Sequence, residues 1–366
     1  MKTSHYDKVT GVGFFLAILC FLSVITFHFP EYLSNPMMRA SYDVNQLRML
    51  LFFSLYLSLA CGLIGLCLSR FKKRALATIA LICLSVTLGG SAVRVPETVD
   101  QAHYYLSVDL IILDLLFMSL IFVPLERAFF LRKQRFLREG LPTDLAHYGF
   151  NHLLMGGIFF LIALPGNFLR DRFLLPEIPL YVRSLPIGVQ VLAILFIADL
   201  CQYWVHRSFH TRPRLWQFHK IHHSVLTMDW LASSRLHVID VIITRAISYI
   251  PIVWLGFSET AIHIYLPIVA IQALFVHSNV RFEFGWLRYV LTTPSVHHWH
   301  HSSEEPALDK NFAVSFSVID VVFGTFYCPR AWPSRYGLHD ETISENFVKQ
   351  LFFPFIRVIK AKSFKG

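Results

Sequence analysis

Histidines are concentrated in one region of the chain, and their spacing suits metal binding. Twelve of the 18 histidines lie between His206 and His301, where an even spread would place about five. Imidazole is the commonest metal ligand among side chains and suits transition metals. The region therefore predicts a metal site. It contains an isolated His277 and three motifs, namely His206-Arg-Ser-Phe-His210, His219-Lys-Ile-His222-His223 and His297-His298-Trp299-His300-His301.

The spacing within the motifs predicts that their ligands lie on helices. The i, i+3, i+4 spacing of each His-x-x-His-His motif puts three rings on one helical face. Before the first motif, Asp199, Tyr203, His206 and His210 follow the spacing i, i+4, i+7, i+11 of one face. From that spacing we expect the Asp199 carboxylate to hold a ligand histidine in the right tautomer, the usual supporting role of an acidic residue.

The number of histidines indicates two metal ions. One zinc ion takes four ligands, so nine candidates are too many for one ion and suit two. Nitrogen ligation favours iron, zinc or copper over magnesium or calcium, and nine ligands would be wasteful for a structural zinc. We therefore expect an open dinuclear iron centre that activates oxygen. The nine candidate ligands are His206, His210, His219, His222, His223, His277, His297, His300 and His301.

Three histidines of the same region are not counted as ligands. His298 falls between residues that already complete its motif, so a supporting role is expected for it. The sequence leaves two roles open for His237, either as a metal ligand or as a residue that positions other groups of the site. His263 lies near a predicted turn on the far side of the membrane and is expected to be structural.

The composition indicates a membrane protein. Hydrophobic residues make up 55% of the 366 residues and charged residues 16%, against about 25% charged in soluble domains. The net charge of +9 fits basic cytoplasmic loops, and no basic stripe on a soluble module points to nucleic acid. The six cysteines form no Cys-x-x-Cys pair and are expected to be small apolar residues.

Eight apolar segments are long enough, or nearly so, to cross a bilayer. The first has no cleavage site after it and is expected to remain as an anchor. The segments cover residues 11–29, 47–69, 75–93, 105–125, 148–166, 186–204, 238–256 and 261–277.

Basic residues predict the orientation of these segments. The loop Arg70–Arg74 and the stretch Arg127–Arg138 are separated by two crossings, so both can be cytoplasmic under the positive-inside rule. Counting onward, the chain reaches the same side before His206 and again at His277. All the histidine motifs are thus predicted on the cytoplasmic side, although the count made no use of them.

The chain resembles the fatty acid hydroxylase/sterol desaturase superfamily of integral-membrane di-iron enzymes over about residues 105–330. Several matching motifs bind no metal, which makes coincidence an unsatisfactory explanation. Besides the three histidine motifs, the match includes Leu125-Glu126-Arg127, Thr143-Asp144-Leu145, Asp199-x-x-x-Tyr203-Trp204-x-His206-Arg207, Thr293-Pro294, Asp309-Lys310-Asn311-Phe312, and Asp320 with Phe323-Gly324-Thr325.

The resemblance implies an all-α membrane bundle with a cytosolic helical cap over two irons. It implies that the nine histidines are the ligands, that oxygen is a substrate, and that two electrons come from NAD(P)H through a partner redox protein. The substrate would be a lipid such as a sterol, fatty acyl chain, alkyl-ether lipid or carotenoid. Some relatives have a histidine pair where this chain has His277-Ser278-Asn279, so Asn279 is a weak ligand or a supporting group. Asn311 is also open between these roles.

The predicted organisation has three parts: N-terminal membrane segments 1–104 outside the resemblance, a catalytic region 105–330 and a cytosolic tail 331–366. Hydroxylation is the leading reaction, and desaturation on the same site is an alternative. A non-enzymatic metal-binding or transport protein would line the spans themselves with histidines. A bis-histidine haem protein would leave the paired motifs unexplained.

Overall fold

The computed structural model describes most of the chain and shows an all-helical protein. The described backbone covers 5–36, 39, 43–95, 106–135, 137–173, 175, 177–339 and 341–363, and side chains within it are described except at 155–163 and 359–363. Within these residues β-structure is limited to two isolated bridges, Phe130 with Val280 and Ser302 with Tyr336. The predicted all-α class is confirmed.

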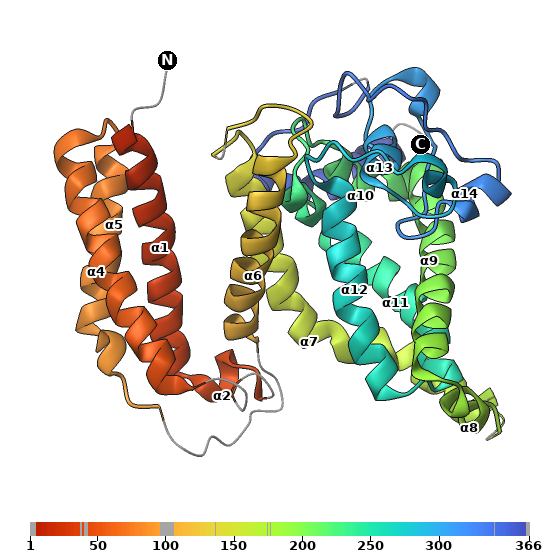
Figure 1. Cartoon of the computed structure of the whole chain (residues 1–366), viewed down its shortest axis with the longest axis horizontal. Helices are drawn as coiled ribbons and strands as arrows, with labels where there is room; N and C mark the ends of the chain where they lie inside the picture. Colours follow the sequence, from red (N-terminus) through yellow and green to blue (C-terminus); the bar gives the residue numbers. More distant parts are fainter. Residues whose placement is uncertain are drawn as a thin grey trace. The chain divides into compact units, whose positions relative to one another are not determined.

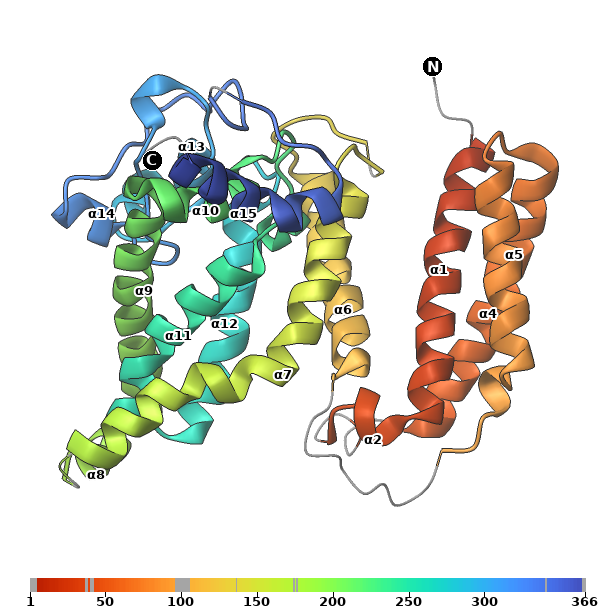
Figure 2. The same cartoon turned by 180° about the vertical axis from the view of Figure 1, so that it is seen from behind.

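Seven helices in the described residues are long and apolar enough to cross a membrane. The fifth of the eight predicted segments, 148–166, lies within α7 (Leu141–Phe173), a longer helix that contains Pro165. Figure 2 shows α7 bending along its course, as a proline inside a helix can cause. The seven spans are His5–His28, Val44–Leu68, Lys72–Ala92, Val108–Ala128, Ile187–Thr211, Val238–Leu255 and Glu259–His277.

The chain divides into two compact units, residues 1–117 and 118–366. The predicted boundary between residues 104 and 105 lies outside the described residues. Unit 1 contains three packed helices (Figure 1) and a short α2 (Pro30–Leu33). A Cβ atom on Gly13 would lie 2.4 Å from the Cβ atom of Cys61, so glycine permits the close approach of two of the helices. The three are α1 (His5–His28), α4 (Val44–Leu68) and α5 (Lys72–Thr87).

Unit 2 places most of its short helices at one end of the long ones (Figure 1). The long helices α9 (Ile187–Thr211), α11 (Val238–Leu255) and α12 (Glu259–His277) run side by side (Figures 1 and 2). Their apolar core includes Ile194, Ile252 and Ala261. The remaining helices and 3-10 turns of this unit include the end of α6 (Val108–Ala128), α8 (Glu177–Ser184), α10 (Pro213–His223), η2 (Trp230–Ser234), η3 (Gly285–Tyr289), α13 (Pro294–His300), η4 (Glu305–Ala307), α14 (Val318–Val322) and α15 (Phe347–Ser363).

The directions of the long helices bring their histidine-bearing ends to the same end of unit 2. Helix α9 ends, α11 begins and α12 ends at the same end of unit 2, where α10 and α13 lie (Figure 1). The stretch Arg127–Arg138 is at this end as well, since Arg138 pairs with Asp229 just before η2. The basic stretch and the histidine motifs therefore lie at one end of the spanning helices of this unit.

Candidate metal centre

Four helices supply the predicted ligands. The last two turns of α9 carry His206 and His210, and the last residue of α12 is His277. Helices α10 and α13 carry the two His-x-x-His-His motifs, with His301 as the C-cap of α13. Both helices begin with a proline, Pro213 and Pro294. Proline is favoured at this first position because its fixed φ suits the helix and its missing N–H would be unpaired there.

All nine predicted ligands gather into two buried groups. Within each group the candidate ligand atoms lie within 4.8 Å of one another, and these are the two such groups found in the described residues. The groups adjoin, because the rings of His223 in one and His301 in the other are stacked 4.6 Å apart. The five-histidine group contains His206, His210, His219, His223 and His300, and the four-histidine group contains His222, His277, His297 and His301.

The distances between ring nitrogens match those between ligands of one metal ion. The Nε2 atoms of His206 and His219 are 2.9 Å apart. The Nε2 atom of His277 lies 3.0 Å from that of His297, and 3.2 Å from those of His222 and His301. Metal–nitrogen bonds of about 2.0–2.1 Å place neighbouring ligand atoms about 3 Å apart. The residues present therefore fit metal ions of this size.

Protein acceptors hold the opposite nitrogen of most of these rings. The Nδ1 atom of His219 contacts an Asp240 carboxylate oxygen at 2.6 Å, and that of His210 contacts Asp309 at 3.1 Å. A ring that donates from Nδ1 presents an unprotonated Nε2 to a metal. In four other rings the Nδ1 atom contacts a backbone carbonyl. The pairs are His206 with Phe312 at 2.7 Å, His222 with Arg235 at 3.2 Å, His277 with Ala273 at 2.7 Å, and His300 with Lys310 at 2.8 Å.

Several buried ring nitrogens have no hydrogen-bond partner. They include the Nε2 atoms of His210, His223 and His300, all in the five-histidine group. Burying a polar atom without a partner is costly. Three such atoms within one cluster are accounted for if each coordinates an ion.

The surroundings keep the imidazole rings neutral. For the histidines of α10 and α13, burial lowers the pKa well below its usual value, and neighbouring histidines lower it further. Neutral imidazole is the form that binds metal. The ligands are therefore ready to coordinate at neutral pH without first losing protons.

Asp199 acts at one remove from the histidines, so its expected direct contact with a ligand ring is wrong. Its carboxylate accepts backbone N–H groups from Val314, Ser315 and Phe316 at 2.7–3.0 Å. This fixes the segment that contains Phe312, whose carbonyl orients His206. Asp199 and His206 share a helix face as predicted, but Asp199 supports His206 only through the loop that contains residues 312–316.

Asp320 and Tyr203 secure the same segment. Asp320 accepts the N–H groups of Phe312 and Ala313 at 2.8 and 2.9 Å. The Tyr203 ring is fully buried beside Phe312, and its hydroxyl lies 3.1 Å from the hydroxyl of Thr325. Tyr203 thus supports the segment that orients His206.

The structure places the remaining supporting candidates outside both histidine groups. His237 caps α11 by accepting the N–H of Ile239, and its Nε2 atom contacts the Leu351 carbonyl. His298 contacts the Tyr336 hydroxyl at 2.7 Å and the Ser278 carbonyl at 3.1 Å.

Asn279 and Asn311 are occupied with backbone groups. The side chain of Asn279 accepts from the N–H of Arg132 and donates to its carbonyl. The side chain of Asn311 donates to the carbonyls of Val296 and Tyr327. Both amides thus fix loops next to ligand-bearing segments.

Sequence reasoning missed three acidic supports. Asp240 and Asp309 contact ligand histidines directly, and Glu126 accepts the N–H groups of Asn279 and Trp230, both at 2.8 Å. Asp240 offered a signal, since it is a lone carboxylate in the apolar helix α11. The other two act through contacts between segments more than 90 residues apart in sequence.

Candidate spanning helices that end in buried all-histidine groups are the arrangement expected of an integral-membrane metal-binding protein. Comparison with known proteins makes the class specific: residues 191–325 match the fatty acid hydroxylase family. This match and the relatives below support the superfamily that the motifs predicted.

Three relatives illustrate the similarity. The chain is 33% identical over 176 residues to ornithine lipid hydroxylase OlsE of Rhizobium tropici, covering 47% of this chain and 52% of that protein. It is 32% identical over 129 residues to alkylglycerol monooxygenase of Homo sapiens, covering 35% and 28%. It is 26% identical over 142 residues to methylsterol monooxygenase 1-2 of Arabidopsis thaliana, covering 38% and 47%. The chain thus spans about half or less of these relatives, and no solved structure matches it.

Proposed function

We propose that this protein is a membrane oxygenase that hydroxylates an unactivated C–H bond of a lipid. The observation that carries the proposal is the pair of adjoining, buried, all-histidine groups at one end of the spanning helices. The relatives support it, because their names describe hydroxylases and monooxygenases of an ornithine lipid, alkylglycerols and methylsterols. The lipid class for this chain is therefore a membrane amphiphile.

The nine histidines of the two groups would hold two iron ions. Nitrogen-only ligation disfavours magnesium and calcium, and two adjoining groups suit a dinuclear centre better than one structural ion. Bound iron would supply the reduction of oxygen. The protein's own part is to keep the rings neutral, to orient them through groups such as Asp240 and the Phe312 carbonyl, and to exclude water by burial.

Atom balance sets the co-reactants. Conversion of R–H to R–OH with one oxygen atom of O2 leaves the other atom as water, and this requires two electrons and two protons. We propose that the electrons come from NAD(P)H through a partner redox protein. The basic stretch Arg127–Arg138 lies at the same end as the histidines, which supports a cytoplasmic position for the centre.

An apolar hollow offers a path for the lipid tail. A hollow of about 320 Å³ lies between α9 and α12, lined by Leu195, Ile268, Ile271, Phe275 and Phe316 among others. Its lining residue Phe275 is two residues before the candidate ligand His277 on α12, so the hollow lies near the end of α12 that carries this histidine. A tail lying in it would approach the centre from within the bilayer.

Labelled oxygen tests the proposal. Cells with and without the chain are grown under ¹⁸O2, and their lipids are compared by mass spectrometry. We expect a lipid species that gains one ¹⁸O atom only when the wild-type chain is present. An alkene without ¹⁸O would assign desaturation instead.

If the purified protein holds two irons but consumes no oxygen with any lipid and reductant, that result would contradict the proposal that it is an oxygenase. It would favour the metal-binding or transport alternative. A haem Soret band in the pure protein would favour the bis-histidine cytochrome.

A further inference from the structure

Helix α15 carries an apolar stripe that is exposed among the residues the structure describes. Val348, Phe352, Phe355 and Ile356 are 43–57% exposed, and they follow the i, i+4, i+7, i+8 spacing of one helix face. Such a stripe is unusual on a surface that meets only water.

The opposite face of α15 is fixed to the rest of unit 2. Gln350 is fully buried and its side-chain oxygen lies 2.9 Å from the Nε2 atom of His147. The Leu351 carbonyl contacts the Nε2 atom of His237 at 3.0 Å. The helix is therefore docked, and the exposed stripe is not the result of a helix detached from its partners.

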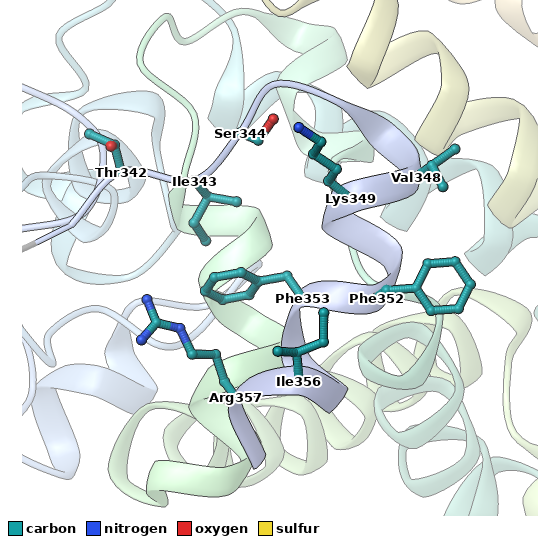
Figure 3. A pocket seen from close by; sticks show the side chains of 9 residues that line it. All are labelled: Thr342, Ile343, Ser344, Val348, Lys349, Phe352, Phe353, Ile356 and Arg357. Carbon is teal, nitrogen blue, oxygen red and sulfur yellow. The ribbon is translucent and has the colours of Figure 1, made fainter. Parts of the chain in front are cut away.

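The charge of this segment is of one sign. Residues 347–366 contain no aspartate or glutamate and five basic residues, namely Lys349, Arg357, Lys360, Lys362 and Lys365. Lys349 and Arg357 flank a hollow of about 440 Å³ that Phe353 and Ile356 also line (Figure 3). Arg357 also pairs with Glu341 at 2.9 Å. An apolar stripe bordered by cations complements the acyl boundary and headgroups of an anionic lipid leaflet.

The position of α15 fits such a surface. Figure 2 shows α15 lying across the direction of α9, α11 and α12, at the end where the histidine motifs lie. The ends of spanning helices mark the level of the membrane surface. A helix that lies crosswise at this level, apolar on one face and cationic beside it, has the features of an interfacial helix.

We propose that α15 lies in the bilayer interface, with Val348, Phe352, Phe355 and Ile356 inserted among lipid chains and its cations against anionic headgroups. This contact also supports the metal centre. The Phe355 ring packs against Phe218 of α10, at 5.5 Å between centroids, and α10 carries three of the nine candidate ligands. The bilayer thereby braces the helix that contributes to both histidine groups.

Lipid quenching of a fluorophore tests the proposal in the full chain. The six cysteines are replaced, and a bimane label is attached at Phe352→Cys in protein reconstituted in nanodiscs. Phe53→Cys on the spanning helix α4 is the lipid-facing control, and Glu305→Cys, with a side chain 82% exposed, is the solvent-facing control. Each labelled protein must elute as the unlabelled one does.

We expect lipids brominated near the headgroup to quench the Phe352 label, and iodide to quench it about threefold less than the Glu305 label, since interfacial helices insert about 5–10 Å. Quenching by lipid should rise when phosphatidylglycerol replaces phosphatidylcholine.

Iodide quenching equal to that at Glu305 with no lipid quenching would overturn the proposal. Protection from both quenchers would also overturn it, because another protein would then cover the stripe. Equal quenching by lipid with phosphatidylglycerol and with phosphatidylcholine would refute the role of the cations. None of these outcomes depends on turnover, so they are independent of the proposed reaction.

Discussion

At the scale of single residues, most candidate ligands are oriented by a group that contacts their other ring nitrogen. His222 and His300 illustrate this, since backbone carbonyls of Arg235 and Lys310 accept from their Nδ1 atoms. The carbonyls belong to loops, so a ring is oriented by segments outside its own helix. A substitution of the ring removes a ligand and leaves the loop that oriented it in place.

We expect His222→Ala and His300→Ala each to lower the metal content by about one ion per chain and to abolish lipid hydroxylation, because an open ligand position weakens a site of four or five donors. Metal analysis of purified protein measures this. His263→Ala, at an exposed position on α12, is the control and should retain the wild-type metal content. Wild-type metal content in either ligand variant would refute the assignment.

Asp240 is the clearest supporting residue. Its carboxylate lies 2.6 Å from the Nδ1 atom of His219, and both side chains are buried. Asp240→Asn keeps the shape but weakens the acceptor, so we expect metal affinity to fall by about 10–100-fold. Competition with a chelator measures the affinity. Asp171→Asn, at an exposed carboxylate, should leave it unchanged, and unchanged affinity in Asp240→Asn would exclude this role.

At the scale of elements, α10 and α13 each serve both histidine groups. Adjacent residues on a helix point about 100° apart. In the pair His222-His223 one ring therefore enters each group, and in the pair His300-His301 the same holds. The doubled histidines of the motifs thus give each helix end one ring in each group.

A buried ionic network joins the elements around α10. Asp144 at the start of α7 contacts Arg138 at 2.6 Å and Arg235 at 2.5 Å, and it is fully buried. Arg138 also pairs with Asp229 and Arg235 with Glu345. Because the Arg235 carbonyl accepts from His222, this network fixes the loop that orients a candidate ligand.

We expect Asp144→Ala to destabilise the protein by about 3–5 kcal/mol, because two buried guanidinium groups lose a partner. The apparent Tm of detergent-purified protein should fall accordingly. Asp171→Ala removes an exposed ion pair and should change stability by less than about 1 kcal/mol. An equal effect of the two substitutions would show that the network does not stabilise the fold.

At the scale of the whole molecule, the metal centre joins segments that are distant in sequence. The candidate ligands come from α9, α10, α12 and α13, and residues beyond 330 pack onto the same unit through Glu345 and Leu351. We propose residues 105–330 as the catalytic region, with the segment that follows bracing it. A centre tied to so many segments couples metal binding to the stability of the unit.

Removal of the metals should therefore destabilise unit 2. A ligand present at a thousand times its Kd contributes about 4 kcal/mol, so we expect chelation to lower the Tm by about 5–10 °C. Differential scanning fluorimetry measures the change, and added ferrous iron under anaerobic conditions should restore the Tm. A Tm indifferent to chelation, with metal loss verified, would contradict the coupling.

The sequence by itself predicted the candidate ligands, the candidate membrane spans and the family resemblance. These depend on local pattern: nine histidines at helical spacing, and apolar segments of bilayer length. Tertiary structure alone decided how the nine divide into groups of five and four, and which residues orient them. Asp199 shows why, since its helix face was predictable, but its partners are 115 or more residues away in sequence. Spacing fixes which side chains share a face, whereas only packing fixes what that face meets.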